Sequence, residues 1–103
     1  MSTEKVMGLL GFARRSQKTA SGDATVEAFL KKGKVHLLIL ADDASPGISK
    51  KLQFWCEDLG VPVQRFGSKT ALGLALGQSA RSAVAILDEG FAQAIRKALS
   101  DDS

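Results

Sequence analysis

The amino-acid sequence predicts an α/β fold in which helices cover both faces of a central sheet. Segments with apolar residues at helical spacing alternate with short strand-like runs. Two of those runs, residues 35–41 and 82–87, are almost continuously apolar, which is typical of strands buried on both faces. The chain has 103 residues, 45% of them hydrophobic, so we expect one core and a single domain over residues 1–103.

The first part of the chain predicts two helices and then a strand. Residues 4–15 carry apolar side chains at amphipathic helical spacing. Residues 19–22 predict a short extended segment or a turn, which leads into a second helix that ends at Gly33. Residues 35–41 are too few for a helix and predict a buried strand.

The third helix has the clearest boundaries in the sequence. Ser45 offers a capping hydroxyl, Pro46 suits the first helical position, and Gly60 is a stop signal. The apolar stripe of this helix predicts that Trp55 and Cys56 point into the core, while Phe54 lies partly outside it.

The last part of the chain repeats the alternation of strand and helix. Residues 61–66 are strand-like, and Ser68 opens a short helix that Gly77 closes. Residues 82–87 predict another buried strand, and Asp88 is placed to cap a final helix.

The charge distribution and the cysteine content limit which partners and which cell compartment suit this protein. The net charge is +3, and residues 1–34 hold seven basic side chains against three acidic ones, whereas the rest holds seven against eight. A basic excess confined to the first third suits either a solvated face or an anionic partner. The single cysteine excludes an intrachain disulfide, and no apolar run is long enough for a membrane span, so we expect a cytoplasmic protein.

Acidic residues after two predicted strands raise the alternative of a metal or phosphoacceptor site. Asp42 and Asp43 follow one strand and Asp88 follows another, while Lys69 follows residues 61–66, as in a receiver-like domain. Asp88 is explained as a helix cap. His36 lies within an apolar strand and Cys56 on a core stripe, so we expect no enzyme, no metal and no cofactor.

The start of the second helix is the strongest candidate for a binding site. Residues 18–25 are polar, contain Gly22, and lead directly into that helix. Unpaired N–H groups and partial positive charge at a helix N-terminus bind phosphate, and glycine permits close approach of a backbone. Arg14, Arg15 and Lys18 lie just upstream.

Several stretches together resemble a known family. They are Ala13-Arg14-Arg15 with Lys18, Ser21-Gly22-Asp23, residues 38–44, residues 60–63, Gly67-Ser68-Lys69, Leu72-Gly73, Ala75, Gly77 and residues 83–90. In order and spacing they resemble the kink-turn-binding ribosomal proteins of the L-seven-Ae and L-thirty-e type, especially the small bacterial YlxQ-type members. The resemblance implies a three-layer α/β/α sandwich with a mixed four-stranded sheet. It also implies a monomer that binds structured RNA, either ribosomal RNA or another kink-turn RNA, with the ribosome as an expected partner and no membrane.

The resemblance also implies which residues contact RNA. Residues 21–28 and 77–82 correspond to the contact surface of the family, which recognises RNA by shape and splayed bases. The predicted RNA-binding residues are Arg14, Arg15, Lys18, Ser21, Gly22, Ala24, Thr25, Lys32 and Arg81. Ala24, Thr25 and Ala28 stand where the strongest binders carry Asn, Glu and Lys, so we expect weak binding of a standard kink-turn. A protein-interaction module with the same fold is the alternative.

Overall fold

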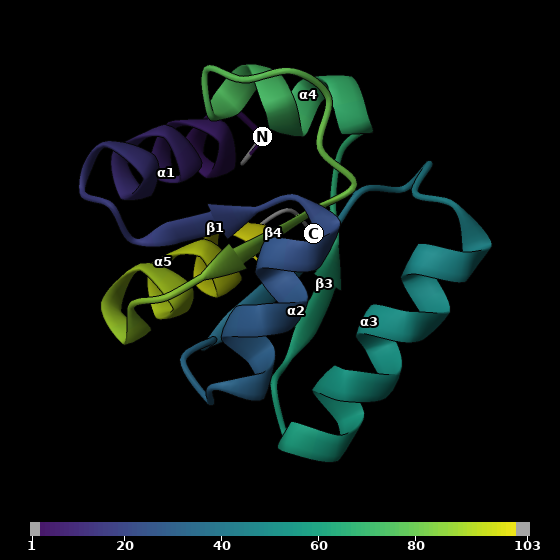
Figure 1. Cartoon of the computed structure of the whole chain (residues 1–103). Coiled ribbons are helices and arrows are strands. Elements are labelled where there is room, and N and C mark those ends of the chain that lie inside the picture. The colour runs from purple at the N-terminus through teal and green to yellow at the C-terminus, as the bar shows by residue number, and fades with distance from the viewer. Residues whose placement is uncertain (1–2, 101–103) are drawn as a thin grey trace.

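A computed structural model describes residues 3–100 and contains five helices and four strands (Figure 1). The elements in chain order are α1 Thr3–Arg15, β1 Thr19–Ser21, α2 Asp23–Lys31, β2 Leu37–Leu40, α3 Pro46–Leu59, β3 Val63–Arg65, α4 Lys69–Ala75, β4 Ala83–Ile86 and α5 Glu89–Ser100. The predicted alternation of helices and strands is confirmed, although the strands are shorter than the apolar runs that predicted them.

The four strands form one mixed sheet in the order β1-β4-β2-β3. β4 runs antiparallel to both β1 and β2, whereas β2 and β3 are parallel. Every residue of β2 and β4 is buried, which confirms the prediction that these two strands are central. β1 lies at one edge and is hydrogen-bonded within the sheet only to β4, so one side of it stays available to other groups.

Helices cover both faces of the sheet, so the architecture is the three-layer α/β/α sandwich that the resemblance implied (Figure 1). Leu37 and Ile39 of β2 face a core shared with α1, α4 and α5, whereas Leu38 and Leu40 face a core shared with α2 and α3. Ala83 and Ala85 of β4 face the second core, and their small side chains leave room for α2 to approach closely.

The predicted helix caps are present. The Ser45 hydroxyl accepts a hydrogen bond from the Ile48 N–H, and the Asp88 carboxylate accepts one from the Phe91 N–H at 2.9 Å. Gly60 ends α3 in the left-handed conformation. None of the helices within residues 3–100 is both long and apolar enough to cross a bilayer.

The core prediction for the third helix holds fully for Cys56 and in part for Trp55. Cys56 is completely buried, and Phe54 is 65% exposed. Trp55 is half-buried at the rim of the second core, because its indole N–H donates a hydrogen bond to the Glu27 carboxylate at 3.1 Å.

Candidate RNA-binding site

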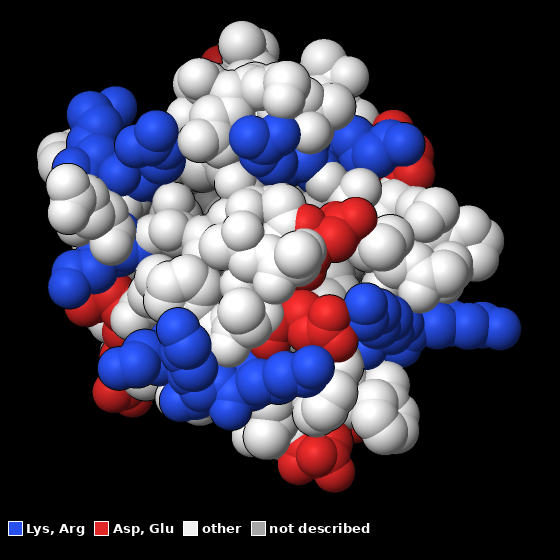
Figure 2. Space-filling view, in the orientation of Figure 1, with Lys and Arg blue, Asp and Glu red and all other residues white. Residues whose placement is uncertain are grey.

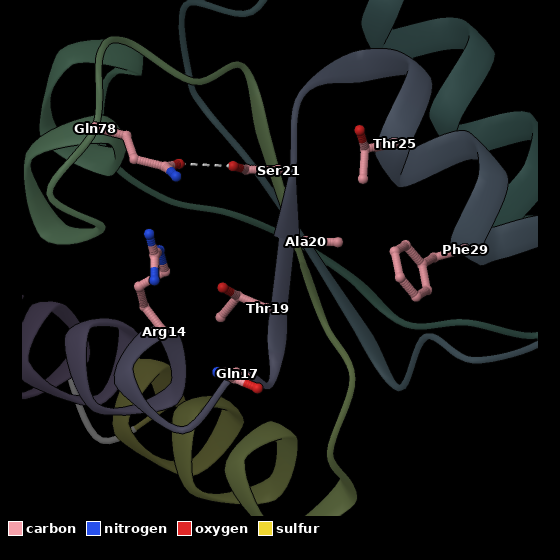
Figure 3. Close-up of a pocket in the computed structure, with 8 residues that line it drawn as sticks. All are labelled: Arg14, Gln17, Thr19, Ala20, Ser21, Thr25, Phe29 and Gln78. Carbon is pink, nitrogen blue, oxygen red and sulfur yellow. Dashed lines mark hydrogen bonds between the residues drawn. The ribbon is translucent and has the colours of Figure 1, made fainter.

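A groove of about 310 Å³ runs along the free edge of β1, between the end of α1 and the start of α2. Its lining residues come from α1, β1, α2, and the loops beside them: Arg14, Gln17, Thr19, Ala20, Ser21, Thr25, Phe29 and Gln78. Figure 3 shows Arg14, Thr19, Ser21 and Gln78 on one side of β1, with Ala20, Thr25 and Phe29 on the other. The groove therefore has a polar side and a side with an aromatic ring.

The start of α2 is open at this groove. Gly22 occupies the N-cap position with φ 93° and ψ 136°, and no side chain caps the helix there. A residue with a Cβ is strained at this φ, so glycine is needed for the turn. Ala24 and Thr25, in the first turn, are exposed. The first N–H groups of α2 and the positive end of its dipole are therefore accessible to an anion.

A hydrogen-bond network joins β1 to the loop that precedes β4. The Ser21 hydroxyl donates to the Gln78 side-chain oxygen at 2.9 Å and accepts from the Arg81 Nε at 3.0 Å. Arg81 Nε also donates to Gln78 at 3.2 Å, and its Nη1 donates to the Ser79 hydroxyl at 2.8 Å. Ser21 and Arg81 are thus brought together as predicted, and they hold the wall of the groove in place.

The predicted basic residues lie in three positions relative to the groove. Arg14 lines it and also lines a second hollow of about 400 Å³ between α1 and the end of α4, where Arg15 joins it. Lys18 is exposed between α1 and β1. Figure 2 shows groups of basic side chains around a largely uncharged central surface, which also carries acidic side chains.

Lys32 lies at the other end of α2 from Gly22. It follows the last residue of that helix, and its ammonium nitrogen stands over the Phe29 ring, 5.6 Å from the ring centroid. The structure therefore does not bring Lys32 together with the open N-terminus of α2. Its link to the groove is through Phe29, which lines the groove.

The acidic residues of α2 differ in their surroundings. Glu27 pairs with Lys51 of α3 at 3.0 Å and with Lys31 of its own helix at 3.6 Å. The Lys51 hydrogen bond, aided by the charge of Lys31, holds the pKa of the Glu27 carboxyl below its ordinary value of 4.5. This charge is therefore neutralised locally, whereas Asp23 is exposed in the first turn of α2.

The acidic residues of the alternative metal site take part in local structure. The Asp43 carboxylate accepts a hydrogen bond from the Lys69 N–H at 2.8 Å, and Asp88 caps α5. Among residues 3–100, no three His, Cys, Asp or Glu side chains gather where they could hold a metal ion. Burial raises the pKa of the Cys56 thiol to about 11, so it stays protonated at neutral pH.

Two groove residues, Gln17 and Phe29, lie outside the segments that the sequence predicted for the site. Thr19, Ala20 and Gln78 lie within the predicted segments 18–25 and 77–82 but were not among the predicted RNA-binding residues. Phe29 falls within the predicted second helix, and its spacing there does not reveal that it lines the groove. Gln78 comes from a loop 57 residues away from its partner Ser21, and no local pattern signals that contact.

Similarity to known proteins agrees with this architecture. The profile of the Ribosomal protein L7Ae/L30e/S12e/Gadd45 family matches residues 4–96. RNA-binding protein YlxQ of Bacillus subtilis (strain 168) is 36% identical over 92 residues, which cover 89% of this chain and 92% of that protein. Large ribosomal subunit protein eL8 of Cenarchaeum symbiosum (strain A) is 33% identical over 91 residues, covering 87% of this chain and 72% of the other.

Solved structures share the fold. A protein of unknown function from Bacillus halodurans C superimposes with a TM-score of 0.90 and 31% identity, covering 93% of this chain and 97% of that one. The Giardia lamblia 15.5kD RNA binding protein superimposes with a TM-score of 0.81 and 27% identity, covering 97% of this chain and 86% of that one. The chain therefore belongs to the L7Ae/L30e/S12e/Gadd45 family of ribosomal proteins and is similar to its YlxQ-type members.

Proposed function

We propose that residues 1–103 act as a single, non-enzymatic RNA-binding domain that recognises a kink-turn or a related sharp bend in structured RNA. In this proposal the protein is a cytoplasmic monomer that associates with the ribosome or with ribosomal RNA. The groove at β1 is the observation that carries the proposal, because it joins an open helix N-terminus to cationic and hydrogen-bonding side chains.

Each part of the groove suits one part of a bent RNA. The uncapped N–H groups after Gly22 suit a phosphate, as does the Arg14 guanidinium on the opposite side of the groove. The Thr25 hydroxyl is exposed and can hydrogen-bond to a base edge or a ribose. The Phe29 ring lines the same groove and offers a surface for an unstacked base. The named RNA-binding relatives support this assignment.

In the proposed site, Arg14, Arg15 and Lys18 supply phosphate contacts, and Lys32 extends the basic surface along α2. Ser21 and Arg81 act mainly by holding the loop, because their polar groups already bond to each other and to Gln78. Gly22 sets the turn, and the exposed positions Ala24 and Thr25 face the RNA from the first turn of α2.

The proposal is tested by the salt dependence of binding to a kink-turn RNA. Arg14→Ala and Lys18→Ala are each expected to weaken binding and to lower the log–log salt slope by up to about one unit, because each removes one phosphate contact. Lys50→Ala is the matched control, since Lys50 is an exposed cation on α3, away from the groove. The decisive comparison is between the wild type and the Arg14→Ala, Lys18→Ala double variant. If both bind the RNA with the same affinity and the same salt slope, the groove is not the RNA-binding site.

A further inference from the structure

Gln17 has an unusual backbone conformation. Its φ is 60°, and it is the single non-glycine residue with positive φ among residues 3–100. The other residues with positive φ are all glycines: Gly22, Gly33, Gly60, Gly67 and Gly77. A side chain is disfavoured in this left-handed region because its Cβ crowds the backbone. The chain therefore keeps a side chain at position 17 against a conformational cost.

The hydrogen bonds around Gln17 show why its backbone takes this conformation. The Lys18 N–H donates to the Ala13 carbonyl at 2.8 Å, and the Gln17 N–H donates to the Arg14 carbonyl at 3.0 Å. These two bonds form the Schellman motif that ends α1, in which the residue at the position of Gln17 is usually glycine. Glycine would therefore satisfy the local structure better than glutamine does.

The side chain of Gln17 faces the groove. It lines the groove together with Arg14 and Thr19, and Figure 3 shows it at the end of the groove where β1 begins. The residue is exposed, and its carboxamide has no hydrogen-bond partner within residues 3–100. Gln78, at the opposite end, is instead bonded to Ser21 and Arg81. The Gln17 carboxamide is therefore free to bind a ligand.

A carboxamide recognises one base edge especially well. It presents an acceptor oxygen beside a donor NH₂ group, which match the N6 donor and N7 acceptor of adenine. Guanine offers two acceptors on the corresponding edge, so the carboxamide oxygen would stay unpaired against it. Arg14 beside Gln17 suits the phosphate of the same nucleotide.

We infer that Gln17 is a specificity-determining residue whose carboxamide reads the N6 and N7 edge of an unpaired adenine in the groove. This inference rests on the proposed RNA-binding function and deepens it. The left-handed glutamine is retained for the base contact, because the end of α1 alone would favour glycine. Backbone strain that does not help the protein to fold is frequently found at binding sites.

The test compares Gln17→Gly with the wild type in two measurements, urea unfolding and affinity for a kink-turn RNA. The variant is expected to unfold at a higher urea concentration and to bind the RNA about fivefold to a hundredfold more weakly, since two neutral hydrogen bonds are lost. Replacing the adenine that contacts Gln17 by 7-deazaadenine is expected to weaken binding by the wild type but not by Gln17→Gly. Because the adenine that contacts Gln17 is not known in advance, each unpaired adenine of the RNA is replaced in turn. Gln93→Ala, on the exposed face of α5, is the control and is expected to leave the affinity unchanged.

The outcomes separate the inference from the proposed function. If Gln17→Gly binds every RNA as tightly as the wild type, or loses affinity equally for adenine and 7-deazaadenine RNAs, Gln17 does not read a base and the inference is wrong. If Gln17→Gly is not more stable than the wild type, the left-handed conformation of Gln17 carries no cost and the inference loses its starting point. If the wild type itself binds no kink-turn RNA, the proposed function fails and the inference fails with it.

Discussion

The Arg81 Nε lies 3.0 Å from the Ser21 hydroxyl, so a residue of the loop before β4 is tied directly to the edge strand β1. The same guanidinium reaches Gln78 and Ser79, which are neighbours in its own loop. Arg81 therefore fixes the position of the loop relative to the groove. This role differs from that of a free cation that only attracts phosphate.

The first prediction is that Lys cannot replace Arg81. Arg81→Ala is expected to lower the free energy of unfolding by about 1–3 kcal/mol, because two partly buried hydrogen bonds of about 1 kcal/mol each and further exposed ones are lost. Arg81→Lys keeps the charge but cannot make the Nε and Nη1 bonds together, so it is expected to recover little stability. Urea unfolding measures both variants. Full recovery by lysine would show that charge alone matters at this position.

The second prediction concerns Gly73, which lies within α4 under the same loop. A methyl group at position 73 would overlap the backbone carbonyl of Ser79, so the loop would have to move. Gly73→Ala is expected to cost about 1–3 kcal/mol through overpacking and to weaken RNA binding by displacing Gln78. Gly8→Ala is the control, because nothing lies within 4 Å of the added Cβ, and in helix α1 it should stabilise by up to about 1 kcal/mol. Unchanged stability of Gly73→Ala would contradict the close packing of the loop on α4.

The third prediction follows from the ion pairs of Glu27. Its pKa is lowered in the folded protein, so its contribution to stability is present above the ordinary value of 4.5 and is lost as the pH falls below that value. Glu27→Gln is expected to be less stable at neutral pH and to lose less stability on acidification. Glu57→Gln, an exposed residue on α3, is the control. Identical acid unfolding curves for Glu27→Gln and wild type would show that Glu27 contributes nothing through ionisation.

The fourth prediction addresses the three positions of α2 that differ from the strongest binders of the family. Ala24, Thr25 and Ala28 are all exposed, so their replacement should barely change stability. The combined variant Ala24→Asn, Thr25→Glu, Ala28→Lys is expected to bind a standard kink-turn at least tenfold more tightly, because added polar contacts exceed 1.4 kcal/mol together. A straight duplex is the control RNA and should gain much less. No gain with the kink-turn would favour a protein-interaction role.

The helix ends and the central strands were predicted well because residues close together in the sequence determine them. Ser45, Gly60 and Asp88 mark helix ends through hydrogen bonds and backbone conformation within a few residues. The apolar runs of β2 and β4 correctly predicted that both strands are central, since burial on both faces leaves no polar positions. The strand ends were predicted too long, because apolar residues such as Val35 continue beyond the ladder.

The candidate site was less predictable because its contacts join distant parts of the chain. Glu27 meets Lys51 across 24 residues and Ser21 meets Arg81 across 60, and neither pairing has a local signal. The left-handed conformation of Gln17 is also hidden, since glutamine does not usually mark a helix end. The sequence was enough to propose basic residues for the site, but the separation of Lys32 from the open end of α2 was visible only in the structure.

The most direct test of the proposed site is to map amide chemical shifts of the isotopically labelled protein during titration with a kink-turn RNA. We expect the largest changes in residues 14–25 and 77–82, which form the groove and its loop, and little change in the amides of α3. Changes confined to α3 or α5, or spread evenly over the molecule, would contradict the assignment of the groove as the RNA-binding site.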